Sequence, residues 1–114
     1  MDNFTIQYIA TALWAETGAD GEPLDANHDT DDFAPEAIAR AESDCARFRE
    51  LAGDAIAGRE DQAAHDLWLT RNGHGAGFWD GDWPEPASTV LTDAAHAMGE
   101  CYAYVGDDGR VYFG

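Results

Sequence analysis

The sequence predicts an α+β fold in which three to four helices pack with a C-terminal antiparallel β-hairpin. Apolar residues recur at three- and four-residue steps over several segments before residue 99, as on one face of a helix. Residues 101–113 instead alternate in the strand manner about a Gly-Asp-Asp-Gly turn. At 114 residues the chain can bury one modest core, so we expect a single domain, 1–114.

The first half predicts two helices separated by an acidic loop. Residues 4–17 fit the helical period better than strand alternation, and Gly18 follows as a helix stop. Residues 18–33 are dense in Gly, Pro, Asn and Asp, which is typical of a loop. Pro35 suits the first position of a second helix, whose apolar stripe continues to Gly58.

The second half predicts two further helices and the hairpin. A third helix is expected from Glu60 to about Leu69 or Thr70, followed by a glycine-rich loop and an extended, proline-containing connector over 81–86. Ser88 is the expected N-cap of a fourth helix over 89–98. Because two strands alone are marginally stable, a third strand around Phe78 and Trp79 would complete a small three-stranded sheet.

Charge is the most unusual property of the composition. The chain carries 23 acidic residues against six arginines and no lysine, for a net charge of -17. Such a surface repels phosphate, so direct binding to nucleic acid or to an anionic membrane is not expected, and basic partners are favoured. Three explanations stay open: carboxylates that imitate nucleic-acid phosphates, bulk adaptation of the kind seen in halophiles, and binding of a hard cation.

Leader, membrane and redox signals are absent from the sequence. No apolar run approaches the length of a membrane span and no charged leader precedes one, so a cytoplasmic location is expected. Cys45 and Cys101 have no CxxC spacing and are expected to be reduced core residues, because zinc sites need four closely spaced ligands. We therefore expect no metal and no cofactor.

One stretch has the spacing of a calcium loop. Oxygen-bearing side chains occupy positions 1, 3, 5, 7 and 12 of a twelve-residue loop, namely Asp25, Asn27, Asp29, Asp31 and Glu36. Thr30 stands where the sharp turn requires glycine. A solvated acidic loop is therefore the favoured interpretation, with calcium as the alternative.

The stretch 65–82, HDLWLTRNGHGAGFWDGD, holds the residues most suggestive of chemistry. Arg71, Asn72 and His74 lie between large aromatic residues, a combination that suits an anionic ligand or acid–base work. The chain offers no nucleophile elbow and no phosphate-loop ending, so catalysis is not expected. The competing structural interpretation pairs Arg71 with a carboxylate and gives the glycines a tight return; the other histidines, His28, His65 and His96, are expected to be structural.

Four segments carry a resemblance: FTIQYIATALW, DGEPLD, HDLWLTRNGHGAGFWD and YVGDDGRVYFG. They resemble a family of small acidic proteins encoded by bacteriophages and mobile elements, for which no enzymatic role is known. The resemblance implies an inhibitor of host defence, of the anti-CRISPR or antirestriction type. It carries over no site residues.

We accordingly expect a non-enzymatic DNA mimic that binds a basic, nucleic-acid-binding host protein. The alternatives are a small ligand-binding or enzymatic domain using Arg71, Asn72 and His74, and a halophile-type acidic domain. A homodimer stays open. The residues expected to bind the partner are acidic or aromatic: Asp25, Asp29, Asp31, Asp32, Trp79, Asp80, Asp82, Trp83, Asp107 and Asp108.

Overall fold

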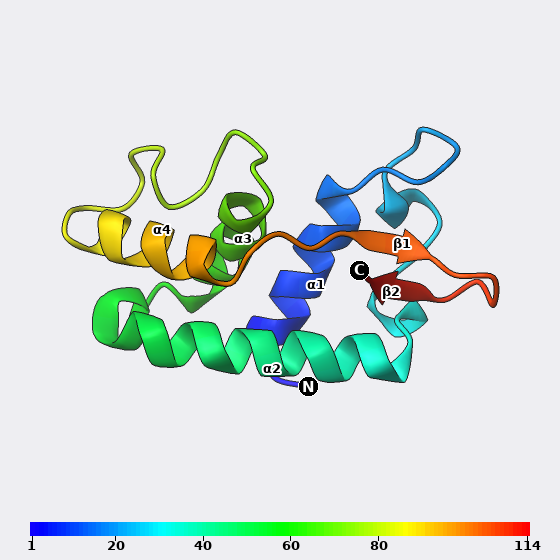
Figure 1. Cartoon of the computed structure of the whole chain (residues 1–114), viewed down its shortest axis with the longest axis horizontal. Coiled ribbons are helices and arrows are strands. Elements are labelled where there is room, and N and C mark those ends of the chain that lie inside the picture. The colour runs from blue at the N-terminus through cyan, green and yellow to red at the C-terminus, as the bar shows by residue number, and fades with distance from the viewer.

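Four helices and a two-stranded hairpin make up the computed structural model, which describes residues 1–114 (Figure 1). This arrangement confirms the α+β prediction. The bounds are α1 Asn3–Ala15, α2 Pro35–Ala52, α3 Glu60–Arg71, α4 Ala87–Ala97, β1 Ala103–Val105 and β2 Val111–Phe113, with the short 3-10 turns η1 Leu24–Ala26, η2 Thr30–Asp32 and η3 Gly53–Ile56.

Helix α2 lies along the longest dimension of the molecule, which measures 43 Å, and α1 crosses it (Figure 1). Helices α3 and α4 with the loop 72–86 occupy one end of the molecule. The hairpin and the loop 18–33 occupy the other end (Figure 1). The segment 98–103 connects the two ends across the middle.

Local hydrogen bonds explain where the first two helices begin and end. Asp2 accepts the Thr5 N–H at 2.8 Å and so caps α1. That helix ends at Ala15, before the predicted end, because the following residues turn back to form an isolated bridge between Thr17 and Pro23. Helix α2 begins at Pro35 as predicted but ends at Ala52; the positive φ of Gly53 then leads into the 3-10 turn that buries Ile56.

The prediction that Ser88 caps α4 is wrong. The helix begins at Ala87, and the Ser88 hydroxyl donates to the Phe78 carbonyl at 2.8 Å. The carboxylate of Glu85 takes the capping role instead, since it accepts the Thr89 N–H at 2.8 Å. The Ser88 hydroxyl thus connects the glycine-rich loop to α4 and does not cap the N-terminus of the helix.

The hairpin has two strands, and its additional contact comes from a different segment than predicted. Phe33, not Phe78 or Trp79, forms an isolated parallel bridge with Val111, and the Ala34 N–H donates to the Val111 carbonyl at 2.9 Å. Phe78 is unavailable because it is fully buried in the helical core. The start of α2 therefore attaches the hairpin to the helices.

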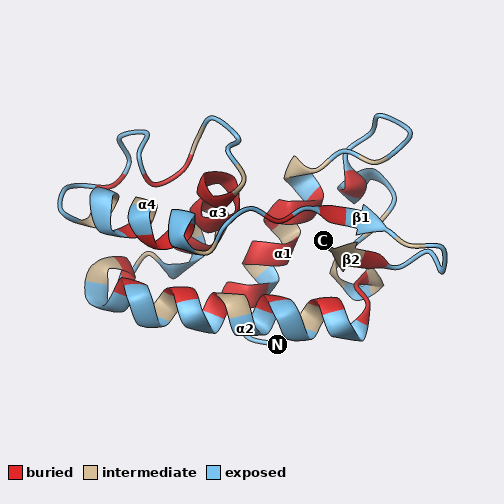
Figure 2. Cartoon of the chain, viewed as in Figure 1, coloured by how far each residue is buried: buried red, intermediate tan, exposed pale blue.

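The core is one cluster of 27 buried apolar residues drawn from all four helices and both strands (Figure 2). The Tyr8 ring meets the edge of Trp68 with centroids 5.4 Å apart, and Phe48 stacks on Phe78 at 5.5 Å. Cys45 and Cys101 are free and buried, as predicted. None of the helices is long and apolar enough to cross a membrane.

Candidate functional site

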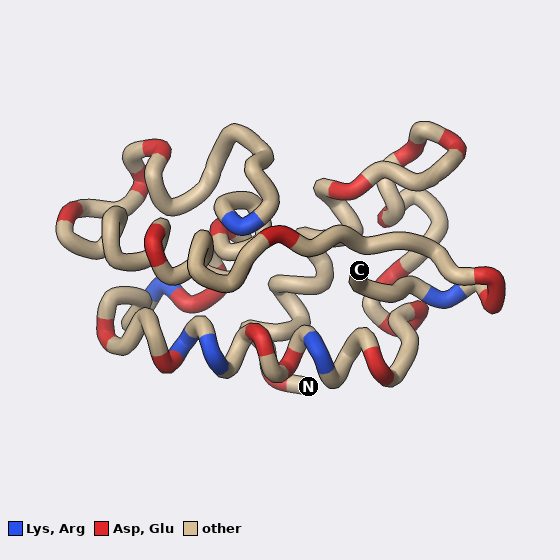
Figure 3. Tube along the Cα trace, viewed as in Figure 1, with Lys and Arg blue, Asp and Glu red and all other residues tan.

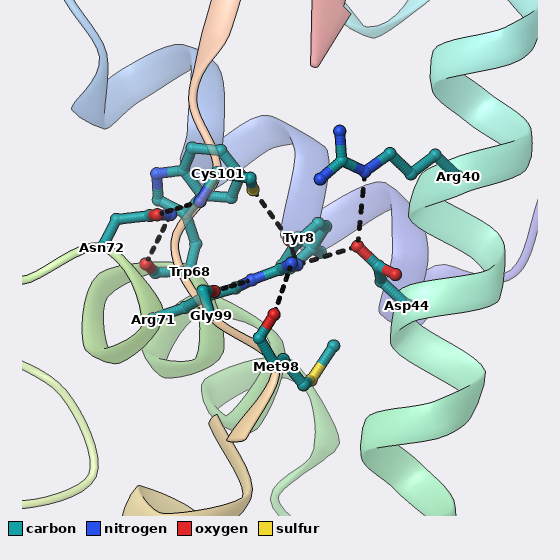
Figure 4. A network of polar contacts seen from close by, with 9 residues as sticks. All are labelled: Tyr8, Arg40, Asp44, Trp68, Arg71, Asn72, Met98, Gly99 and Cys101. Atoms are coloured by element: carbon teal, nitrogen blue, oxygen red, sulfur yellow. Dashed lines mark hydrogen bonds and ion pairs between the residues drawn. The ribbon is translucent and has the colours of Figure 1, made fainter. Parts of the chain in front are cut away.

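Arg71 is a buried residue in the last turn of α3, not part of an exposed loop (Figure 4). Its guanidinium donates to the Tyr8 hydroxyl at 2.9 Å, to Asp44 Oδ2 at 2.8 Å, and to the carbonyls of Gly99 and Met98 at 2.6 and 3.3 Å. Every nitrogen of this guanidinium group, which we call the Arg71 fork, donates a hydrogen bond. One side chain therefore joins α1, α2, α3 and the segment that leads to β1, which fits the structural interpretation of this residue.

The surroundings of Arg71 keep it charged. Burial disfavours the guanidinium charge, but Tyr8 and Asp44 outweigh that effect and raise the pKa of Arg71. Burial also raises the pKa of the Tyr8 hydroxyl and of the Cys101 thiol. Neither group ionises near neutral pH, so the one charged group that Arg71 contacts is the carboxylate of Asp44, and the cluster offers no ionised thiol or phenol as a nucleophile.

Asn72 and His74 lie apart from the Arg71 fork. Asn72 accepts the Cys101 N–H at 2.8 Å and donates to the Trp68 carbonyl at 3.2 Å, while His74 Nε2 lies 3.5 Å from a carboxylate oxygen of Glu16. Both residues line an open hollow of about 480 Å³ whose other charged side chains are Glu16 and Glu100. Two carboxylates in the lining disfavour an anionic ligand, and Arg71 does not reach this hollow.

The glycine-rich loop packs back tightly on α3. Gly77 has φ +147°, and a Cβ at this position would overlap the Thr70 hydroxyl oxygen. The next residue, Phe78, donates its N–H to the same hydroxyl at 3.0 Å. This close approach is the tight return expected of the glycines.

Trp83, predicted as an exposed residue for a partner, belongs to the core. It is 3% exposed, its indole N–H donates to Asp66 Oδ2 at 2.7 Å, and the Arg59 guanidinium lies 3.8 Å from its ring centre. Burial raises the pKa of Asp66 although the indole hydrogen bond opposes that shift. Trp79, by contrast, is 53% exposed and remains available on the surface.

The carboxylates predicted to bind a partner divide between the two ends of the molecule (Figure 3). Asp80 and Asp82 lie in the loop before α4, at the end formed by α3 and α4. The others lie at the hairpin end: Asp25, Asp29, Asp31, Asp32, Asp107 and Asp108.

The hairpin end gathers the densest negative charge, and we call it the acidic end. Its carboxylates come from segments 18–36 and 106–113, where Arg110 is the only arginine: Asp20, Glu22, Asp25, Asp29, Asp31, Asp32, Glu36, Asp107 and Asp108. Local hydrogen bonds hold some of these carboxylates in position, because Asp29 and Asp32 form a capping box at η2. The Tyr112 hydroxyl donates to Asp108 at 2.6 Å, which lowers the pKa of that carboxyl.

The residues spaced as a calcium ligand set do not form a cation cage. Asp25 lies in turn η1, Asp31 lies in turn η2, and Glu36 lies in the first turn of α2. The carboxylates of Asp29 and Asp32 face backbone N–H groups rather than a common centre. Nowhere do three His, Cys, Asp or Glu side chains converge as a metal site requires. These residues thus have the sequence spacing of a calcium-binding loop, but their side chains do not surround a common position that a cation could occupy.

An exposed tyrosine ladder beside the acidic end was not predicted as a functional surface. Tyr102 and Tyr104 are 59% and 43% exposed, and Tyr104 stacks on Tyr112 with ring centres 5.7 Å apart. Tyr102 lies at the same 5.7 Å from Tyr104. The alternation of residues 101–105 places these tyrosines on one face, a signal that could have identified the ladder.

Two surface features thus distinguish the chain, the acidic end and the tyrosine ladder beside it. The acidic end joins segments that are distant in sequence, as the hairpin packs against the loop 18–33 and the start of α2, whereas the ladder lies within the hairpin. No protein-family model, curated protein or solved structure matches the chain.

Proposed function

We propose that this protein is a non-enzymatic inhibitor that occupies the nucleic-acid-binding surface of a basic host protein. The observation that carries the proposal is the density of its negative charge. Duplex DNA carries one phosphate per roughly 1.7 Å of axis, hence about 25 phosphates over a length of 43 Å. This chain places 23 acidic residues over the same length, and only Asp66 among them is buried.

The arginines do little to dilute this charge at the surface. Arg71 is buried, and Arg49 donates to Asp2 at 2.7 Å. Arg40 lies 3.8 Å from Asp44, and Arg59 lies over the Trp83 ring. These four arginines thus contact groups of the fold, and only Arg47 and Arg110 are exposed without such a contact. The carboxylates far outnumber these two cations at the surface, which favours fast, salt-sensitive association with a basic protein.

The acidic end is the favoured contact surface, because it combines carboxylates with exposed aromatic rings. Tyrosine and arginine are among the residue types enriched at binding hot spots, and tyrosine rings stack well on arginine. The resemblance to phage-encoded acidic proteins supports a target in host defence, of the CRISPR or restriction type, and a cytoplasmic site of action. We propose a macromolecular partner and no cofactor.

The test uses two variants of equal charge. Asp25, Asp31 and Asp107 make no side-chain hydrogen bond at the acidic end, and we would change all three to Asn. The matched control changes three equally free carboxylates elsewhere, Asp54, Asp61 and Asp93, to Asn. Basic proteins retained from host lysate at low salt are identified, purified and loaded with labelled DNA, and displacement of that DNA by each variant is measured.

We expect wild-type protein to displace the DNA and the acidic-end variant to do so with about tenfold lower affinity. The reason is that three lost charge contacts of about 0.5 kcal/mol each together correspond to about a tenfold change in affinity. The control variant should lose much less. Equal losses in both variants would indicate charge that only keeps the protein hydrated, as in a halophile-type domain. Failure to retain any basic protein at low salt would contradict the proposal directly.

A further inference from the structure

The hairpin register determines which backbone groups of β1 are used. Tyr102 and Gly114 exchange both backbone hydrogen bonds, at 3.3 and 2.9 Å, and the Gly106 N–H donates to the Arg110 carbonyl at 2.8 Å. In an antiparallel pair, hydrogen-bonded and non-hydrogen-bonded positions alternate. Between these pairs, Tyr104 is therefore the one β1 residue whose N–H and carbonyl both face β2.

Ala103 and Val105 consequently direct their N–H and carbonyl groups away from β2. Neither residue exchanges a backbone hydrogen bond with any segment outside the hairpin. The far edge of β2 differs, because the Ala34 N–H already donates to the Val111 carbonyl there. The hairpin thus has one occupied edge and one open edge, and the open edge belongs to β1.

A groove runs beside this open edge. A hollow of about 180 Å³ lies between residues 103–105 and the loop 17–24, and no residue of β2 lines it. A second hollow of about 250 Å³ adjoins it at Val105, and Asp20 and Glu22 contribute to its lining. Space next to the unpaired backbone groups is therefore bordered by carboxylates.

Charge and shape together indicate the occupant. Exposed sheet edges bind extended peptides as added strands, with main-chain hydrogen bonds supplying affinity. The acidic end favours a positively charged peptide and disfavours a second copy of this chain, whose net charge is also -17. Alternate residues of an added strand would lie beside Tyr102 and Tyr104, where arginine can stack on the rings.

We propose that β1 accepts an extended basic segment of the partner protein as an added strand. This inference rests on the proposed function and specifies how the acidic end makes contact. Basic arms that bind nucleic acid are commonly extended and unstructured when free. The backbone of such an arm supplies hydrogen-bond partners for the unpaired N–H and carbonyl groups of Ala103 and Val105. Its basic side chains supply the positive charge that the surrounding carboxylates favour.

The experiment measures binding of a synthetic peptide that alternates arginine and threonine. Val105→Pro removes the outward N–H and spares the β1–β2 hydrogen bonds, because Pro is tolerated on a strand edge when its N–H is unused. Val105→Thr is the matched control. A second peptide, N-methylated at alternate residues, loses the opposing donors without any change in the protein. Titration calorimetry gives affinities, and amide chemical shifts of residues 102–106 report the location.

We expect wild type and Val105→Thr to bind the unmodified peptide with shifts at Ala103 and Val105. Val105→Pro, or the methylated peptide, should bind about tenfold more weakly, the factor that one or two lost backbone hydrogen bonds produce. Equal affinity for both peptides would overturn the strand-addition model; if that binding were still salt-sensitive, the proposed function would stand. Absence of peptide binding would overturn this inference alone, since DNA displacement tests the function separately. Self-association abolished by Val105→Pro would show that a second copy occupies the edge.

Discussion

Replacing Arg71 tests whether the buried fork holds the helices together. Arg71→Met keeps much of the side-chain volume but removes the donors to Tyr8, Asp44 and two backbone carbonyls. Breaking a buried ion pair by removing one partner costs about 3–5 kcal/mol. The side chain of Asp44 is 25% exposed and regains water, so we expect the lower value, about 3 kcal/mol.

Urea unfolding followed by circular dichroism at neutral pH measures this difference. Arg40→Gln is the control, because Arg40 approaches the same oxygen of Asp44 at 3.8 Å but is itself 41% exposed. Exposed pairs contribute less than about 1 kcal/mol, so this variant should unfold close to the wild-type midpoint. A loss below about 1 kcal/mol for Arg71→Met, or equal losses for both variants, would refute the structural role assigned to the fork.

Two further predictions concern backbone and capping. Gly77→Ala should destabilise by about 2–3 kcal/mol because its Cβ meets the Thr70 hydroxyl, whereas Gly75→Ala, with open space around it, should cost about 1 kcal/mol; thermal unfolding compares them. Asp2→Ala should cost about 1 kcal/mol at pH 7, since the backbone hydrogen bond from Thr5 lowers the pKa of Asp2 from 3.8 to about 2. The folded pKa is depressed, so this contribution is present above pH 4 and fades toward pH 2; urea midpoints at both pH values measure it.

The helices could be predicted where one face alone is buried. Helix α2 shows this, because its stripe through Ala41, Cys45 and Phe48 is buried while its other face is charged. Helix α3 lacks such a contrast: from Leu67 to Arg71 every residue is buried, polar ones included. Periodicity therefore located α3 but gave no means of placing Arg71 in the interior.

The chemistry of the candidate site could be predicted better than its geometry. Composition alone identified an acidic surface. The indole N–H of buried Trp83 donates to Asp66, a partner 17 residues away that local patterns do not reveal. The contact between the hairpin and Phe33 spans most of the chain, which explains why Phe78 was the wrong choice for a third strand. Pairings of this kind follow from the packing of the whole core.

The arrangement of the arginines links stability to function. Six arginines oppose 23 acidic residues, and one of the six, Arg71, is buried. Little positive charge therefore opposes the surface carboxylates, and added salt should stabilise the fold by screening their repulsion. A halophile-type domain would respond in the same way, so salt dependence of folding does not separate the two explanations. Location does separate them: hydration depends on total charge, whereas recognition depends on which end carries it. The two Asn triple variants have equal net charge and differ only in location, so their comparison tests recognition rather than acidity.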